Sequence, residues 1–182
     1  MNRWARYSVP IVLVAIIFVV YVNSRIINSW DSRWTIYTAV SIIKEGNTDL
    51  DEYKEALEEN EYFAIETFAG RHYSRYPVIV PLIAVPFVYI ADKALIPAIS
   101  AYPWLEKRIR NSTYIRRLSR PLGEKLDVIE LREEIEMYIA ALIVSATSFL
   151  IFLISRRELS VFGAAVVTIV FAFGTSAWST AS

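Results

Sequence analysis

Three long stretches of this chain carry no charged side chain, and this feature constrains the fold more than any other. The stretches cover residues 7–24, 137–155 and 159–182. A helix needs about 20 mostly apolar residues to cross the hydrocarbon core of a bilayer, so each stretch is long enough for one transmembrane helix. Hydrophobic residues make up 55% of the chain, which is high for a soluble domain. The sequence therefore predicts an all-α integral membrane protein with about three transmembrane helices.

The first apolar stretch is expected to be an N-terminal transmembrane anchor, residues 1–23. Arg3 and Arg6 precede its apolar core, and basic residues next to a span stay on the cytoplasmic side. A cleaved signal peptide is the alternative, because Val22 and Ser24 suit the small-residue positions of a cleavage site. The core is long for a signal peptide and has aromatic residues at its ends, which favours an uncleaved anchor with a cytoplasmic N-terminus.

The region after this anchor, residues 24–76, is polar and contains more acidic than basic side chains. Asp31–Glu45 has its apolar residues on one helical face, and the following Gly46 is a residue that commonly closes helices. A second short helix is expected over Asp49–Glu59, and the alternation in Glu61–Tyr76 predicts a small hairpin.

The apolar residues 76–91 contain three prolines and can either cross the bilayer or lie along its surface. If they cross, the basic stretch 107–120 is cytoplasmic and Arg156-Arg157 is outside. If they do not cross, Arg156-Arg157 is cytoplasmic and the whole loop 24–136 is extracytoplasmic. Basic residues orient short loops more strongly than long ones, which favours the second arrangement. The expectation is a multi-pass protein of the cell membrane with juxtamembrane helices in its external loop and two more transmembrane helices in 137–182.

Composition excludes several kinds of functional site. The chain has no cysteine, so disulfides, iron–sulfur clusters and thiol catalysis are excluded. Its one histidine excludes a histidine-rich metal site, and no phosphate-binding or dinucleotide-binding glycine motif is present. The formal net charge is zero, so no overall field favours nucleic acid as a partner.

Three segments occur together in a characteristic order after an acidic residue, Asp31, that opens the first external helix. They are EGNTDLDEY at Glu45–Tyr53, GRHYSRYPVIVPLIAVPF at Gly70–Phe87, and FGTSAWSTAS at Phe173–Ser182. This order resembles the GT-C superfamily of polytopic membrane glycosyltransferases, near the protein-mannosyltransferase-like (family 39) group. The similarity covers most of the chain except residues 95–130.

The resemblance implies transfer of a sugar from a polyprenyl-phosphate carrier to an acceptor on the extracytoplasmic face, with inversion at the anomeric carbon. It also implies that an acidic residue of the first external loop is central to catalysis, and Asp31 occupies that position. A divalent metal cofactor is left open. Members of this superfamily have many more spans, so the chain is expected to be the N-terminal part of a longer enzyme and inactive alone. A non-enzymatic membrane subunit or scaffold is the alternative function.

Each candidate residue also has a purely structural alternative. Asp31 can serve as a helix N-cap. Four hairpin residues can bind a substrate or anchor the hairpin at the membrane interface: His72, Tyr73, Arg75 and Tyr76. Three arginines of the basic stretch can bind a lipid phosphate or contact lipid headgroups in general: Arg116, Arg117 and Arg120. Membrane lipid is thus an expected partner beside the polyprenyl-phosphate donor.

Overall fold

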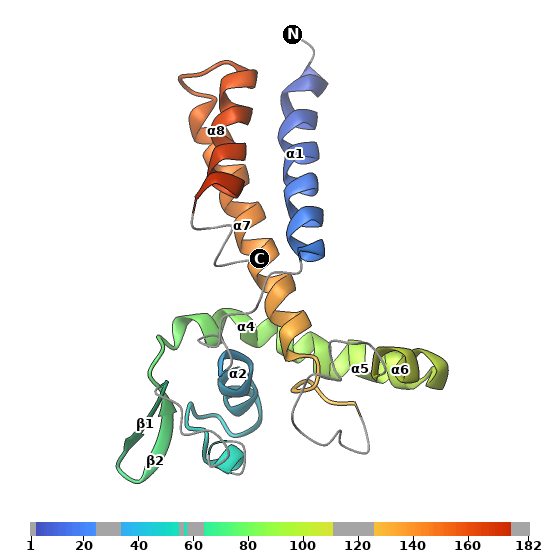
Figure 1. Cartoon of the computed structure of the whole chain (residues 1–182), viewed down its shortest axis with the longest axis vertical. Helices are drawn as coiled ribbons and strands as arrows, with labels where there is room; N and C mark the ends of the chain where they lie inside the picture. The colour runs from blue at the N-terminus through green and yellow to red at the C-terminus, as the bar shows by residue number, and fades with distance from the viewer. Residues whose placement is uncertain (1–2, 25–33, 55–56, 58–63, 111–125, 176–182) are drawn as a thin grey trace. The chain divides into compact units, whose positions relative to one another are not determined.

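The computed structural model describes residues 3–24, 34–54, 57, 64–110 and 126–175 (Figure 1). The described chain is mostly helical and contains one two-stranded hairpin. It forms two compact units: Met1–Ser29 together with Met137–Ser182, and Trp30–Glu136. The two units are described one at a time below.

The first unit is built from α1 (Arg3–Asn23), α8 (Val161–Gly174) and the part of α7 (Arg132–Ser155) that follows Glu136. The helix α1 confirms the helix predicted for the N-terminal stretch. The helix α7 begins five residues before the predicted position 137, because the acidic residues of its first turn favour the positive end of the helix dipole. The helix α8 starts after Ser160, whose hydroxyl accepts a hydrogen bond from the Gly163 N–H at 3.1 Å.

A small cluster of fully or nearly buried residues joins the three helices of this unit. Ile17 and Tyr21 of α1 pack with Ala141 and Val144 of α7 and with Ala172 of α8. The Tyr21 hydroxyl donates a hydrogen bond to the Ala172 carbonyl at 2.5 Å, so the polar end of the ring has a partner inside an apolar contact. Small residues such as alanine let apolar helices approach closely, which is how helices associate in membranes.

The second unit begins with α2 (Thr35–Lys44), which confirms the amphipathic helix predicted after the anchor. Ile36, Ala39 and Val40 are buried on one face, as the periodicity indicated. Gly46 ends the helix with φ at +70°, a left-handed conformation that glycine adopts without strain, and its N–H donates to the Ser41 carbonyl at 3.1 Å.

Three aromatic rings form the core around α2. Trp34 and Tyr37 lie with ring centroids 5.0 Å apart, and Tyr53 meets Tyr37 edge-on at 4.8 Å. Tyr53 belongs to a 3₁₀ turn, η2 (Asp51–Tyr53). This turn replaces the start of the helix predicted over Asp49–Glu59, whose later residues lie mostly outside the described ranges.

The predicted hairpin is present as β1 (Ile65–Phe68) and β2 (Arg71–Ser74), which pair antiparallel with Ile65 opposite Ser74. Its two-residue turn is Ala69-Gly70, with φ of +51° and +78°. Positive φ at both positions is the backbone of a type I′ turn, whose twist matches that of paired strands.

The apolar residues after the hairpin form a longer helix than expected. The helix α4 (Ile79–Ile90) continues through a π-helical turn, η3 (Ala91–Leu95), into α5 (Ile96–Ser100), and α6 (Pro103–Arg110) follows. Pro81 does not interrupt it, because a proline in the first turn of a helix removes no hydrogen bond. The charges at Asp92 and Lys93 do not end it either, because they pair with each other at 2.8 Å.

Two helices in the described part of the chain are long and apolar enough to cross a membrane: α7 and the continuous helix Ile79–Ser100. The apolar part of α1, Ser8–Asn23, and the helix α8 are shorter. Because the helix that contains most of residues 76–91 continues to Ser100, its length gives no reason against crossing, in contrast to the expectation from the sequence.

The aromatic core around α2 predicts a large effect of a single truncation. Trp34 is 1% exposed, so Trp34→Ala should lower the free energy of unfolding by about 3–5 kcal/mol, because it removes a large buried side chain and leaves a cavity. Phe68→Ala is the matched control, since Phe68 is 72% exposed and its loss should change stability by about 0.5 kcal/mol or less. Thermal unfolding in detergent measures both, and equal effects would contradict this core assignment.

Candidate functional site

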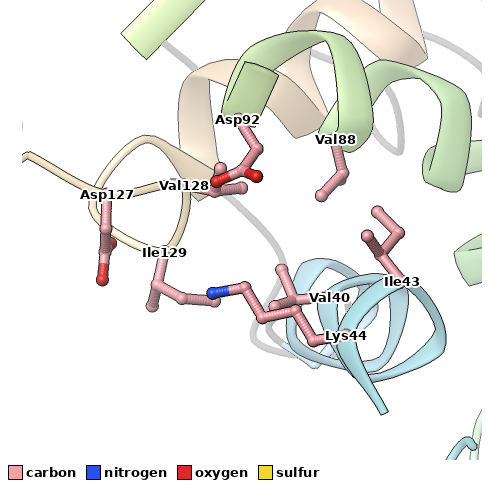
Figure 2. A pocket seen from close by; sticks show the side chains of 8 residues that line it. All are labelled: Val40, Ile43, Lys44, Val88, Asp92, Asp127, Val128 and Ile129. Atoms are coloured by element: carbon pink, nitrogen blue, oxygen red, sulfur yellow. The ribbon is translucent and has the colours of Figure 1, made fainter. Parts of the chain in front are cut away.

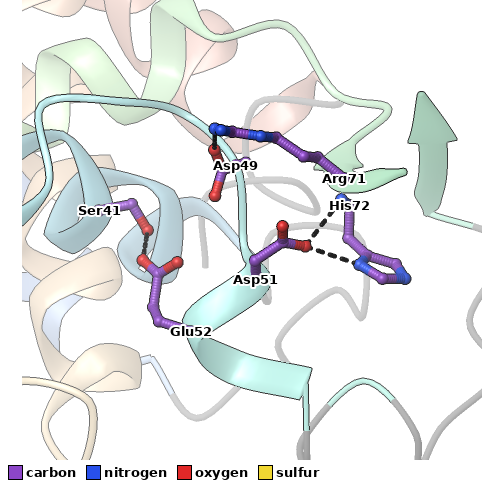
Figure 3. A network of polar contacts seen from close by, with 6 residues as sticks. All are labelled: Ser41, Asp49, Asp51, Glu52, Arg71 and His72. Carbon is purple, nitrogen blue, oxygen red and sulfur yellow. Dashed lines mark hydrogen bonds and ion pairs between the residues drawn. The ribbon is translucent and has the colours of Figure 1, made fainter. Parts of the chain in front are cut away.

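A network of charged groups connects the edge of the hairpin to Asp49 and to the first residue of η2, Asp51 (Figure 3). Arg71 of β2 donates to the Asp49 carboxylate at 2.6 Å. The next residue, His72, places its ring Nδ1 2.8 Å from Asp51 Oδ1 and donates its backbone N–H to the same oxygen at 3.1 Å. The Leu50 N–H donates to the His72 carbonyl at 2.8 Å, so backbone and side chains hold the same edge.

The two charged pairs differ in how far they are buried. The Asp49 side chain is 6% exposed, whereas Arg71, Asp51 and His72 are partly open to solvent. A buried carboxylate needs a partner, and Arg71 supplies it. The hydrogen bond to Asp49 raises the pKa of Arg71. The side-chain hydrogen bond from His72 lowers the pKa of Asp51, so this carboxylate stays ionised into mild acid.

A third polar contact links η2 back to α2. The Ser41 hydroxyl donates a hydrogen bond to the Glu52 carboxylate, as Figure 3 shows. Burial raises the pKa of Tyr53, and the neighbouring Glu52 charge raises that pKa further. The phenol of Tyr53 therefore stays neutral at all ordinary pH values and acts as a packing group of the aromatic core.

The four hairpin residues proposed from the sequence lie together at β2 and just after it. His72 belongs to the charged network, and Tyr73 pairs with Asp49 through an isolated backbone bridge. The Arg75 N–H donates to the Ala64 carbonyl at 2.7 Å, and the Tyr76 N–H donates to the Ser74 hydroxyl at 3.3 Å. The backbone of these residues fixes the hairpin.

Sequence reasoning missed the partners of His72 and Arg71. Asp49 and Asp51 were placed in the helix expected over Asp49–Glu59. In the structure Asp49 instead forms a backbone bridge with Tyr73, and Asp51 begins η2. The adjacent bases Arg71 and His72 on the predicted hairpin were the signal that could have indicated acidic partners.

A small pocket with a cavity volume of about 30 Å³ lies between α2, α4 and the segment that precedes α7 (Figure 2). Aliphatic side chains form most of its wall, and three charged residues stand among them. The lining residues are Val40, Ile43, Lys44, Val88, Asp92, Asp127, Val128 and Ile129. Sequence reasoning did not find this pocket, because its residues come from three distant segments.

The proposed catalytic residue Asp31 and the three arginines Arg116, Arg117 and Arg120 lie outside the described residues. Within the described ranges, no three His, Cys, Asp or Glu side chains converge into a group that could hold a metal ion. No protein-family model matches the chain, and neither a curated protein nor a solved structure shows significant similarity to it.

The Asp51–His72 pair predicts a pH dependence of stability. Because His72 lowers the pKa of folded Asp51, the pair stabilises the fold above the unfolded aspartate pKa of about 3.9, and this contribution is lost as the pH falls through the lowered folded value. His72→Ala should therefore lower the melting temperature at pH 6, though by less than Trp34→Ala does. The difference in melting temperature between His72→Ala and the parent should become smaller below pH 4.

His72→Asn is the matched control, because its side-chain amide can donate the same hydrogen bond that Nδ1 makes. Melting curves of the parent and both variants between pH 3 and pH 7 measure the effect. A His72→Ala difference that is the same at pH 3 and pH 6 would show that the pair does not act through the ionised Asp51.

Proposed function

We propose that the chain is part of a GT-C-like membrane glycosyltransferase, which transfers a sugar from a polyprenyl-phosphate carrier to an acceptor on the extracytoplasmic face. One observation supports this proposal beyond the resemblance itself. Two of the three characteristic segments, Glu45–Tyr53 and Gly70–Phe87, contact each other through the pairs Asp49–Arg71 and Asp51–His72. Segments that define a family by their order are expected to meet in space when they build one site.

The membrane arrangement belongs to the same proposal. Three spans cross the bilayer, at about residues 5–23, 137–155 and 159–178, and α4 lies along the extracytoplasmic surface. Two faces of α4 support this placement. One face is buried against α2 through small or medium side chains: Pro81, Ala84 and Val88. The other face is apolar and exposed: Ile79, Leu82, Ile83, Tyr89 and Ile90.

The helix α6 continues the same membrane-facing pattern. Tyr102 and Trp104 expose most of their surface, and Lys107 and Arg108 stand one turn further along the chain. Aromatic rings and basic side chains are the groups that gather at the headgroup level of a bilayer. A helix with an apolar face followed by such residues suits the interface plane.

Cysteine labelling tests this arrangement, and the chain has no native cysteine to give a background. Ser112→Cys should react with a membrane-impermeant maleimide from outside the cell, because the loop 24–136 is extracytoplasmic. Glu158→Cys is the control, since the exposed connection between α7 and α8 should react only when the cytoplasmic side is opened. Labelling of Ser112→Cys only from the cytoplasmic side would contradict the proposed topology.

The chemistry assigned to Asp31 follows from what inversion requires. The acceptor hydroxyl attacks the anomeric carbon from the side opposite the phosphate, and the polyprenyl phosphate leaves with the bonding electron pair. A hydroxyl is a weak nucleophile, so a carboxylate within hydrogen-bond reach takes its proton as the new bond forms. Asp31 lies shortly after the predicted first span and shortly before Thr35, where α2 begins. This position fits a carrier whose phosphate–sugar bond stands at the membrane surface.

Replacement of the proposed base gives the functional test. In the complete protein, Asp31→Asn should lower turnover by about 10²–10⁴-fold while membrane insertion stays normal, because general-base catalysis supplies an acceleration of that size. Glu45→Gln is the control, since it neutralises an exposed acid at the other end of α2. If Asp31→Asn transfers sugar at the parent rate, Asp31 is not the base, its role is that of a helix cap, and the proposed mechanism is wrong.

A further inference from the structure

The helix α6 has two sides of different character. Trp104, Lys107 and Arg108 lie within about 100° of one another around the helix axis, because residues three and four apart share a face. All three side chains are exposed, and together they form the outer face of α6. The other side of the helix carries its half-buried residues: Leu105, Glu106 and Ile109.

The outer face of α6 is positively charged without a compensating acid. Lys107 and Arg108 form no ion pair within the described part of the chain. Glu106 is the single acidic residue in the sequence of the helix, and it belongs to the half-buried side. Two neighbouring cations with several N–H donors are complementary to a ligand that carries negative charge and several acceptor oxygens.

A tight hydrogen-bonded turn connects α6 to the helix before it. The Tyr102 N–H donates to the Ile99 carbonyl at 2.9 Å, and the Tyr102 carbonyl accepts the Leu105 N–H at 2.8 Å. The orientation of α6 is therefore set by α5, and through α5 by the long apolar helix Ile79–Ser100.

Two aromatic rings indicate where this surface meets a bilayer. Tyr102 is 58% exposed and Trp104 is 64% exposed, so two large rings stand open to the surroundings within three residues. Such rings have an apolar body and a polar tip, and they gather at the headgroup level of membranes. Lys107 and Arg108 follow one turn later, where their charged ends can reach lipid phosphates.

We propose that the outer face of α6 binds the headgroups of anionic phospholipids in the extracytoplasmic leaflet. The Lys107 ammonium and the Arg108 guanidinium donate hydrogen bonds to phosphate oxygens, and the Trp104 ring lies among the headgroups beside them. A zwitterionic phospholipid offers the same phosphate, but its own ammonium opposes the two cations, so lipids with net negative charge bind more tightly. The inference rests on the interfacial placement of α4 in the proposed function, and it is independent of sugar transfer and of Asp31.

Quenching by spin-labelled lipids measures both the placement of α6 and its lipid preference. Ala101→Cys, at an exposed position of the turn before α6, is labelled with a bimane fluorophore in the full chain, which has no native cysteine. The protein is reconstituted into phosphatidylcholine nanodiscs at low salt. A small fraction of the lipid is then phosphatidylglycerol or phosphatidylcholine that carries a nitroxide near its headgroup.

Phosphatidylglycerol should reach the same quenching at a mole fraction about tenfold or more below that of phosphatidylcholine. The reason is that each basic side chain near the bilayer surface contributes about a fivefold factor in affinity for anionic lipid. The preference should become smaller as salt is raised to about 0.5 M, because salt screens the charges.

Two double variants assign the preference to α6. Lys107→Gln/Arg108→Gln should reduce the preference to about twofold or less and leave quenching by phosphatidylcholine unchanged, which also shows that the variant is folded and in place. Lys44→Gln/Lys54→Gln is the matched control, since it removes the same charge from exposed positions of the same unit and should retain the preference.

The outcomes distinguish this inference from the proposed function. Absence of quenching by either lipid would show that α6 does not contact the bilayer, and it would overturn both the inference and the interfacial placement of α4. Equal quenching by both lipids in the parent protein would overturn the inference alone. A preference that survives Lys107→Gln/Arg108→Gln, or that is lost equally in Lys44→Gln/Lys54→Gln, would do the same.

Discussion

The helix α4 is apolar on all sides, but the protein covers only one of its faces. The packing of the second unit depends on how each face of this helix is covered. An apolar surface left in water costs about 25 cal/mol for each Å², so each face requires an apolar neighbour. The face with Pro81, Ala84 and Val88 packs against the buried apolar face of the amphipathic helix α2. The opposite face is exposed among the described residues of this unit, and the proposed function places it against the bilayer.

The contact between α2 and α4 also brings charged groups together. It brings Lys44, at the end of α2, to the same small pocket as Asp92 of the helix that continues α4. On another side of α2, Tyr37 receives the ring of Tyr53, and η2 thereby fixes the acids that hold the hairpin. One amphipathic helix of ten residues thus has α4 on one side and the segment leading to the hairpin on another.

Local patterns in the sequence predicted the local structure. The charge-free stretches located α1 and α7, the periodicity before Gly46 located α2, and the alternation in Glu61–Tyr76 located the hairpin. The continuation of α4 to Ser100 was missed, because the expected apolar segment stopped at residue 91, just before Asp92 and Lys93, which form an ion pair within the helix. The charged network and the pocket join segments far apart along the chain, and their formation depends on how β2 and α4 dock. No spacing within one segment encodes that docking.

The π-helical turn gives the long helix one place at which its length can change by one residue. In this turn the Ile96 N–H donates to the Ala91 carbonyl, five residues back, so the turn holds one residue more than an α-helical turn. Ala91 and Ile99 are both buried, although eight residues separate them and two α-helical turns hold about seven. Deletion of one residue within the turn would convert it to regular α-helix and leave both residues on the same face, whereas a deletion elsewhere in the helix would rotate everything after it by about 100°. Natural variants of Ile79–Ser100 should therefore lose a residue within this turn more readily than at other positions of the helix.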